Sequence, residues 1–219
     1  MSTNFVLLQA VEPQQLDFIE LAIKGGWVMV PILILSVIAV FIFVERFFAV
    51  RRASKVDNHF MSNIREYILS NRTDAAVALC QATTLPQARL IEKGIKRIGA
   101  PLNDIQTAIE NEGNLEVARL ERGLAILAMT AGGAPMLGFL GTVTGMVRAF
   151  FNMANAGNNL DIHILSSGIY EAMVTTIAGL IVGLIAYFGY NLLVAQIQRV
   201  VFHLEASTME FMDMLYGKK

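Results

Sequence analysis

The sequence predicts an all-α integral membrane protein with three transmembrane helices that continue into long cytoplasmic helical extensions. Hydrophobic residues make up 55% of the 219-residue chain and charged residues only 16%. Three stretches, 25–44, 124–147 and 162–198, contain no Asp, Glu, Lys or Arg apart from Glu171. A helix crosses the hydrocarbon core in about 20 residues, so each stretch is long enough to span. A soluble protein with a large helical core is the alternative, but three such stretches leave it too little polar surface.

The composition excludes several classes of protein. The net charge of −1 at pH 7 offers no electrostatic case for a nucleic-acid partner. Cys80 is the single cysteine, so neither an intramolecular disulfide nor a cysteine-based zinc site can form. The sequence has no GxxxxGK[ST] loop and no Ser/His/Asp or Cys/His arrangement. We therefore expect no enzyme activity, no cofactor and no metal site.

The first two segments are an amphipathic stretch and a transmembrane helix. We expect residues 1–24 to lie on the outer side of the membrane, in the interface. Residues 1–23 contain no Lys or Arg, so the apolar run that follows lacks the basic region of a cleaved signal peptide. We interpret it as a retained first transmembrane helix over 25–48, with a bend at Gly25-Gly26.

Basic residues gather on one side of the spans. They follow the first span and precede the second: Arg46, Arg51, Arg52, Lys55, Arg119 and Arg122. Cytoplasmic loops are enriched in Lys and Arg, so residues 49–122 are expected to form a cytoplasmic helical domain. With three spans, the N-terminus is then periplasmic and the C-terminus cytoplasmic, in the inner membrane of a bacterium.

The cytoplasmic part has helical patterning. Apolar residues recur at helical spacing in the order Phe60, Ile64, Tyr67 and Ile68. Thr73 or Asp74 is expected to cap one helix and Asn103 another. No strong stop follows until Gly132-Gly133 and Pro135, so the second span is expected to continue a helix from near Asp104. The remaining segments are the second span over 123–151, an outer loop over 152–164, a third span over 165–195 and a cytoplasmic C-terminal helix over 196–219.

Small residues mark the helix-packing faces of the second and third spans. They are Gly138, Gly141, Gly145, Gly179 and Gly183. In lipid, small residues spaced four apart let helix backbones approach closely. The contact can lie within one chain or between chains, and three helices bury few faces among themselves, which favours an oligomer. Pro135 frees the carbonyl of Ala131 and should bend the helix, which hints at a position beside a pore.

Glu171 is the one acid within a span. A charge at bilayer depth costs at least about 2.5 kcal/mol, so such residues commonly mark ion paths. Glu171 lies near the outer end of its span, however, where Arg148 could form a structural pair with it. Both roles stay open, and they can coexist.

Four threonines add hydroxyl groups to the same two spans: Thr142, Thr144, Thr175 and Thr176. A threonine in a membrane helix commonly bonds to its own backbone one turn earlier. On an ideal helix Thr175 lies about 40° from Glu171 and Thr176 about 140° away. Glu171 and Thr175 should therefore share a face, while Thr176 points elsewhere.

Four stretches together resemble the ExbB/TolQ/MotA family of proton-channel subunits, and most closely ExbB. They are GGWVMVP at 25–31, Glu45-Arg46, APMLGFLGTVTGM at 134–146 and GIYEAMVTTIAGL at 168–180. The resemblance implies a pentamer in the inner membrane whose second and third helices line a pore. It also implies an ExbD-like single-span partner inside the pore and a TonB-like partner that energises outer-membrane transport of iron–siderophore or vitamin B12.

The resemblance also assigns roles to residues. By position in the motifs, Thr142 and Thr176 would be the pore hydroxyls near the partner's aspartate, and Glu171 would be the third-span acid. Thr175, on the same face as Glu171, is counted with them among the residues of the ion pathway. Thr144 and Arg148 depart from the residues common in the family. The alternatives are a TolQ-like or other motor paralogue, and a membrane scaffold that anchors a partner without conducting protons.

Overall fold

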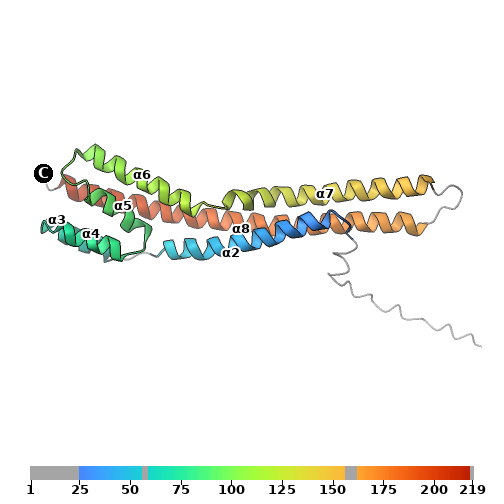
Figure 1. The fold of residues 1–219 in the computed structure, drawn as a ribbon, viewed down its shortest axis with the longest axis horizontal. Helices are drawn as coiled ribbons and strands as arrows, with labels where there is room; N and C mark the ends of the chain where they lie inside the picture. Colours follow the sequence, from blue (N-terminus) through green and yellow to red (C-terminus); the bar gives the residue numbers. More distant parts are fainter. Residues whose placement is uncertain (1–24, 56–58, 156–161, 218–219) are drawn as a thin grey trace, which may run out of the picture. The chain divides into compact units, whose positions relative to one another are not determined.

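The computed structural model describes residues 25–55, 59–155 and 162–217, and the predicted outer segment 1–24 lies outside them. All regular elements within these ranges are helices (Figure 1). They are α2 (Met29–Ala53), α3 (Phe60–Leu69), α4 (Thr73–Ala82), α5 (Pro86–Ile95), α6 (Leu102–Leu120), α7 (Leu124–Asn155) and α8 (Ile162–Tyr216). Helices α2, α7 and α8 are long and apolar enough to cross a membrane. The prediction of an all-helical protein with three spanning helices is confirmed.

The helices belong to two compact units. Within the described residues, the small unit comprises 25–33 and 136–180, and the large unit comprises 34–135 and 181–217. Helix α8 continues without a break from the third span to Tyr216, as the uninterrupted helical patterning predicts.

The large unit has a hydrophobic core to which each helix of the described residues contributes. Phe60, Ile64 and Ile68 of α3 are buried at the predicted helical spacing. They join Ile109 of α6 and Phe211 of α8, both fully buried. Fully burying one such side chain contributes about 1.5–3 kcal/mol. This shared core holds α3 to α6 on the C-terminal part of α8.

An ion-pair network in the large unit connects α2, α5 and α6. The Glu116 side chain, only 4% exposed, accepts hydrogen bonds from Arg89 Nη1 at 2.9 and 3.1 Å and also from Arg119. Arg46 Nη1 of α2 donates to the backbone carbonyl of Arg119 at 3.1 Å. Arg46 also pairs with Glu45 at 2.5 Å. The end of α2 is thereby tied to α5 and α6.

The predicted continuous helix from Asp104 into the second span is wrong. Helix α6 ends at Leu120 and α7 begins at Leu124. Gly123 between them has a φ of +85°, a backbone conformation that glycine adopts without steric cost. The stop signal was present in the sequence, because Gly123 follows the basic residues Arg119 and Arg122. Gly132, Gly133 and Pro135 do not interrupt α7.

The predicted side-chain caps are also wrong. Helix α4 begins at Thr73 itself, with Arg72 at the N-cap and no capping side-chain hydrogen bond. Helix α6 begins at Leu102, one residue before the predicted cap Asn103, with Pro101 at the N-cap. The fixed φ of proline suits the start of a helix, so Pro101 starts α6 earlier than the predicted cap would.

Candidate functional site

Glycines bring α7 and α8 into close contact in the small unit. A Cβ atom added to Gly138 would lie 2.9 Å from the carbonyl oxygen of Thr175, and one added to Gly141 would lie 2.6 Å from Thr175 Cβ. A Cβ atom on Gly145 would lie 3.0 Å from Ala172 Cβ. Any larger side chain at these positions would push the helices apart, which is the physical role of small residues in membrane packing.

Pro135 packs against α8 in the large unit. A Cβ atom on Gly183 would lie 2.5 Å from the Pro135 ring and 3.0 Å from the carbonyl oxygen of Ala131. The carbonyl that Pro135 leaves without a helical partner therefore faces a glycine of the neighbouring helix. Gly179, one turn earlier in α8, is buried. A bend at Pro135 stays a prediction.

Three of the four threonine hydroxyls are bonded within their own helix. Thr142 Oγ1 donates to the Phe139 carbonyl at 2.6 Å, Thr144 to Leu140 at 2.9 Å, and Thr175 to Ala172 at 2.8 Å. This agrees with the common behaviour of threonine in membrane helices. Thr175 is also 1% exposed, so its methyl and hydroxyl groups are packing groups in this chain.

Thr176 differs from the other three. Its Oγ1 donates across the helix pair to the carbonyl oxygen of Gly138 on α7, at 3.1 Å. Both Thr142 and Thr176 remain partly accessible. The hydrogen bond is possible because Gly138 has no side chain to keep α8 at a distance.

Arg148 and Glu171 form an ion pair between α7 and α8. Arg148 Nη1 lies 3.6 Å from Glu171 Oε1, with side-chain exposures of 58% and 30%. The same carboxylate oxygen, Glu171 Oε1, also lies against Gly26, ahead of α2. Sequence reasoning interpreted Gly25-Gly26 only as a bend and missed this contact. The signal for it was the glycine pair itself, although only the fold shows which residue it faces.

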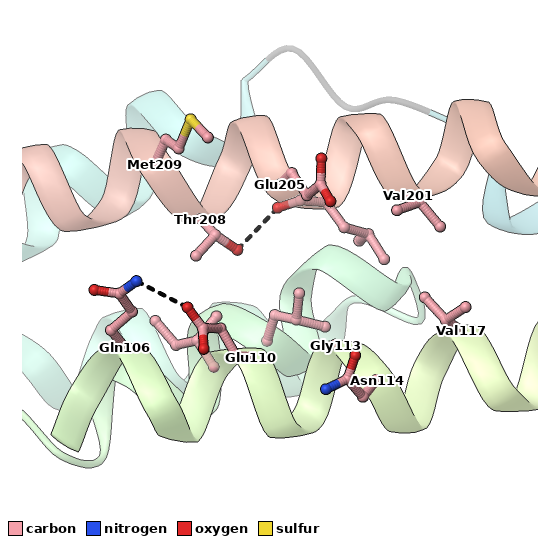
Figure 2. A pocket seen from close by; sticks show the side chains of 12 residues that line it. Gln106, Glu110, Gly113, Asn114, Val117, Val201, Glu205, Thr208 and Met209 are labelled. Atoms are coloured by element: carbon pink, nitrogen blue, oxygen red, sulfur yellow. Dashed lines mark hydrogen bonds between the residues drawn. The ribbon is translucent and has the colours of Figure 1, made fainter. Parts of the chain in front are cut away.

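A groove lies between α6 and α8 in the large unit, with a volume of about 440 Å³ (Figure 2). Gln106, Glu110 and Asn114 of α6 and Glu205 and Thr208 of α8 form its polar edges. Gln106 Nε2 donates to Glu110 Oε1 at 2.8 Å, and Thr208 Oγ1 donates to the Leu204 carbonyl. Thr208 carries the one hydroxyl group among the lining residues, and its proton is directed to a backbone carbonyl rather than to either glutamate.

These features define a class of protein. Three apolar helices are long enough to span a membrane, and α7 and α8 carry threonine hydroxyls and the Arg148–Glu171 ion pair beside glycine-lined contacts. Among the described residues, no group of three or more His, Cys, Asp or Glu side chains is arranged to hold a metal ion. The class is a multi-pass membrane protein whose polar groups lie between closely packed helices.

Comparisons with known proteins identify the family. The profile of the MotA/TolQ/ExbB proton channel family matches residues 82–206, more than half of the chain. An ExbB-like biopolymer transport protein of Synechocystis sp. (ExbB-like 1) is 30% identical over 175 residues, covering 79% of this chain and 69% of that protein. The biopolymer transport protein ExbB of Neisseria meningitidis serogroup A is 27% identical over 180 residues, covering 76% and 80%. The Tol-Pal system protein TolQ of Haemophilus influenzae is 31% identical over 87 residues, covering 40% and 38%.

The chain belongs to the MotA/TolQ/ExbB proton channel family. This is a family of transport and channel proteins rather than of enzymes. The resemblance noted from the sequence motifs is confirmed at the level of the family. The matched residues 82–206 include Thr142, Glu171 and Thr176.

Proposed function

We propose that this chain is the proton-channel subunit of a TonB–ExbB–ExbD-type motor. The complex would use the proton motive force to energise outer-membrane transport, for example of iron–siderophore or vitamin B12. The observation that carries the proposal is that the family match covers all of α7 and the part of α8 that bears Glu171 and Thr176. Each elementary charge that crosses the membrane supplies about 2.3 kcal/mol per 100 mV.

The hydrogen bonds of the hydroxyls leave acceptors for a group that carries a proton. A threonine hydroxyl has one donor hydrogen and two acceptor lone pairs. The hydrogens of Thr142 and Thr176 are directed to backbone carbonyls, so acceptor capacity remains. A protonated carboxyl group can donate to such an acceptor, whereas a carboxylate cannot. The site therefore suits the protonated aspartate that the family resemblance expects on an ExbD-like partner inside the pore.

The basic residues support an orientation. Arg51 and Arg52 are exposed at the end of α2, and Arg122 is exposed beside the start of α7. The enrichment of Lys and Arg in cytoplasmic loops favours a cytoplasmic position for α3 to α6 and for the C-terminus, with the N-terminus in the periplasm. Under this proposal the protein is a multi-pass protein of the inner membrane.

The uncovered faces of the spans support a homo-oligomer, which the family resemblance makes a pentamer. In the most apolar 18-residue stretch of each spanning helix, only 11% (α2), 33% (α7) and 28% (α8) is buried within the chain. Lipid covers part of this surface, and a second copy of the chain covers another part. Gly132 and Gly133 have no atom within 4 Å of an added Cβ atom, so both have room for a neighbouring helix.

A growth assay tests the proposal. In a bacterium that lacks its own ExbB-type subunit, the chain is co-expressed with its ExbD-like partner under iron limitation. We expect Thr142→Val and Thr176→Val to abolish growth on an iron–siderophore, because valine keeps the shape but removes the acceptor. Thr144→Val is the matched control, and Thr142→Ser and Thr176→Ser should retain growth. Full growth of both valine variants at normal protein levels would contradict the pore role and favour a non-conducting scaffold.

A TolQ-type role is the second candidate, and the similarity to the TolQ of Haemophilus influenzae favours it. The same chain can be expressed in a strain that lacks TolQ, and resistance to detergent reports the integrity of the outer membrane. We expect rescue of siderophore-dependent growth but not of detergent resistance. The reverse result would assign the chain to the TolQ branch.

A further inference from the structure

The turn ahead of α2 contains a glycine, and a carboxylate fills the space that a side chain at this position would need. Gly26 has a φ of +66°. A Cβ atom built on Gly26 would overlap Glu171 Oε1 and would lie 3.1 Å from Glu171 Cδ. The carboxylate of Glu171 thus takes up the space in which a side chain at position 26 would begin.

The face of α8 that carries Glu171 also contacts Gly25. A Cβ atom on Gly25 would lie 3.5 Å from Thr175 Cγ2, in ordinary contact. Glu171 and Thr175 are four residues apart and therefore lie on one face of α8. The Gly25-Gly26 turn is the surface against which this face packs. Arg148 of α7 approaches the carboxylate of Glu171 as well, at 3.6 Å.

We propose that Gly26 is a positioning residue for the Glu171 carboxylate. Any side chain at position 26 would displace the carboxylate from the place where it pairs with Arg148. The consequence for proton transport rests on the proposed function, whereas the positioning itself does not.

The test is a thermal-unfolding cycle on the full chain purified in detergent. The cycle compares Arg148→Ala, Glu171→Ala and the double variant. The coupling between the two side chains is the difference between the Tm shift of the double variant and the sum of the two single shifts. The cycle is measured first with Gly26 and then with Gly26→Ala. We expect a coupling in the Gly26 protein and a loss of at least half of it in the Gly26→Ala protein. A glycine needed only for its φ would lower every Tm equally and leave the coupling unchanged.

Two controls separate displacement from backbone strain. Gly99→Ala has the same kind of strain, since Gly99 has a φ of +103° and nothing lies within 4 Å of an added Cβ atom. It should leave the coupling between Arg148 and Glu171 intact. Where Gly26→Ala does not yield folded protein, Gly26→Asn replaces it, because asparagine tolerates a positive φ but still carries a Cβ atom.

The results of this thermal cycle can be told apart from a failure of the proposed channel function. An equal coupling with glycine, alanine or asparagine at position 26 would overturn the positioning role, as would the absence of any coupling in the Gly26 protein. Neither result needs transport activity. Conversely, a failure of Thr142→Val and Thr176→Val to affect growth would overturn the channel role and leave the thermal cycle unchanged.

Discussion

At the residue scale, Glu116 shows how a buried charge is tolerated in the large unit. Its carboxylate is nearly inaccessible and is held by two arginines, Arg89 and Arg119. Breaking a buried ion pair by removing one partner leaves the other charge uncompensated. Here the side chains of both arginines are about half exposed to solvent, so water can replace part of the lost interaction. The network is therefore expected to matter less than a fully buried one.

We predict that Glu116→Gln lowers the free energy of unfolding by about 2 kcal/mol, in the range for hydrogen bonds to charged groups. Thermal unfolding of the full chain in detergent measures the change. Glu110→Gln on the same helix is the control, because Glu110 is exposed and should change stability by less than about 0.5 kcal/mol. Equal effects of the two substitutions would show that the arginine network does not stabilise the fold.

A second residue-scale prediction concerns Cys80. Burial, with a smaller contribution from the nearby charge of Glu92, raises the pKa of its thiol to about 12. The thiolate is the reactive form, so the folded protein should resist alkylation by iodoacetamide at pH 8. Labelling followed by mass spectrometry, before and after unfolding, measures this. Rapid labelling of the folded protein would contradict the buried position.

The same shift predicts a pH dependence of stability. The folded state keeps the thiol proton up to about pH 12, whereas an unfolded cysteine loses it near pH 8.5. This stabilising contribution is therefore complete below about pH 8.5 and is lost as the pH rises towards 12. Comparing Tm between pH 7 and pH 10 for the native chain and Cys80→Ala isolates the effect, since other groups titrate equally in both. Identical pH profiles of the two proteins would be the contrary result.

At the element scale, the glycines of α7 fall into two groups. Gly138, Gly141 and Gly145 contact α8 of the same chain, whereas Gly132 and Gly133 have open space around an added Cβ atom. The first group is needed for the pairing of α7 and α8. The second group is free to contact another chain in the proposed oligomer.

We therefore predict different results for two matched substitutions in α7. Gly141→Leu should reduce the yield of folded protein, because leucine at this position overlaps Thr175. Gly132→Leu should leave the single chain folded, since leucine is a better helix former than glycine by about 1 kcal/mol. It should, however, shift the oligomer to smaller species. Circular dichroism and size-exclusion chromatography measure these effects, and an unchanged oligomer of Gly132→Leu would exclude this face from the interface.

At the scale of the whole molecule, the main prediction is the composition of the complex. Native mass spectrometry of the detergent-extracted chain, alone and with its ExbD-like partner, should detect a pentamer that takes up two partner chains. The exposed apolar faces of the three spans supply the surface for such an assembly. A monomer or dimer that does not bind the partner would count against the motor and leave Arg148 and Glu171 as an ordinary structural pair.

Several properties of this protein could be predicted from local sequence alone. The three spans were predictable because the absence of charge over some 20 residues is a property of consecutive residues. The burial of Phe60, Ile64 and Ile68 followed from their spacing, and the shared face of Glu171 and Thr175 followed from helix geometry. The motifs in the second and third spans were enough to recognise the family. Gly123 was overlooked although its signal was present.

Other properties depend on which distant segments lie side by side, and only the tertiary structure decided them. The carboxylate of Glu171 lies against Gly26, and Thr176 donates to the carbonyl of Gly138. A glycine in the sequence shows that space is available but not which group fills it. Composition and periodicity act over a few turns of helix, whereas these contacts join residues 38 or more positions apart. The sequence alone therefore determined the three spanning helices and the family, and the fold determined which polar groups meet between the helices.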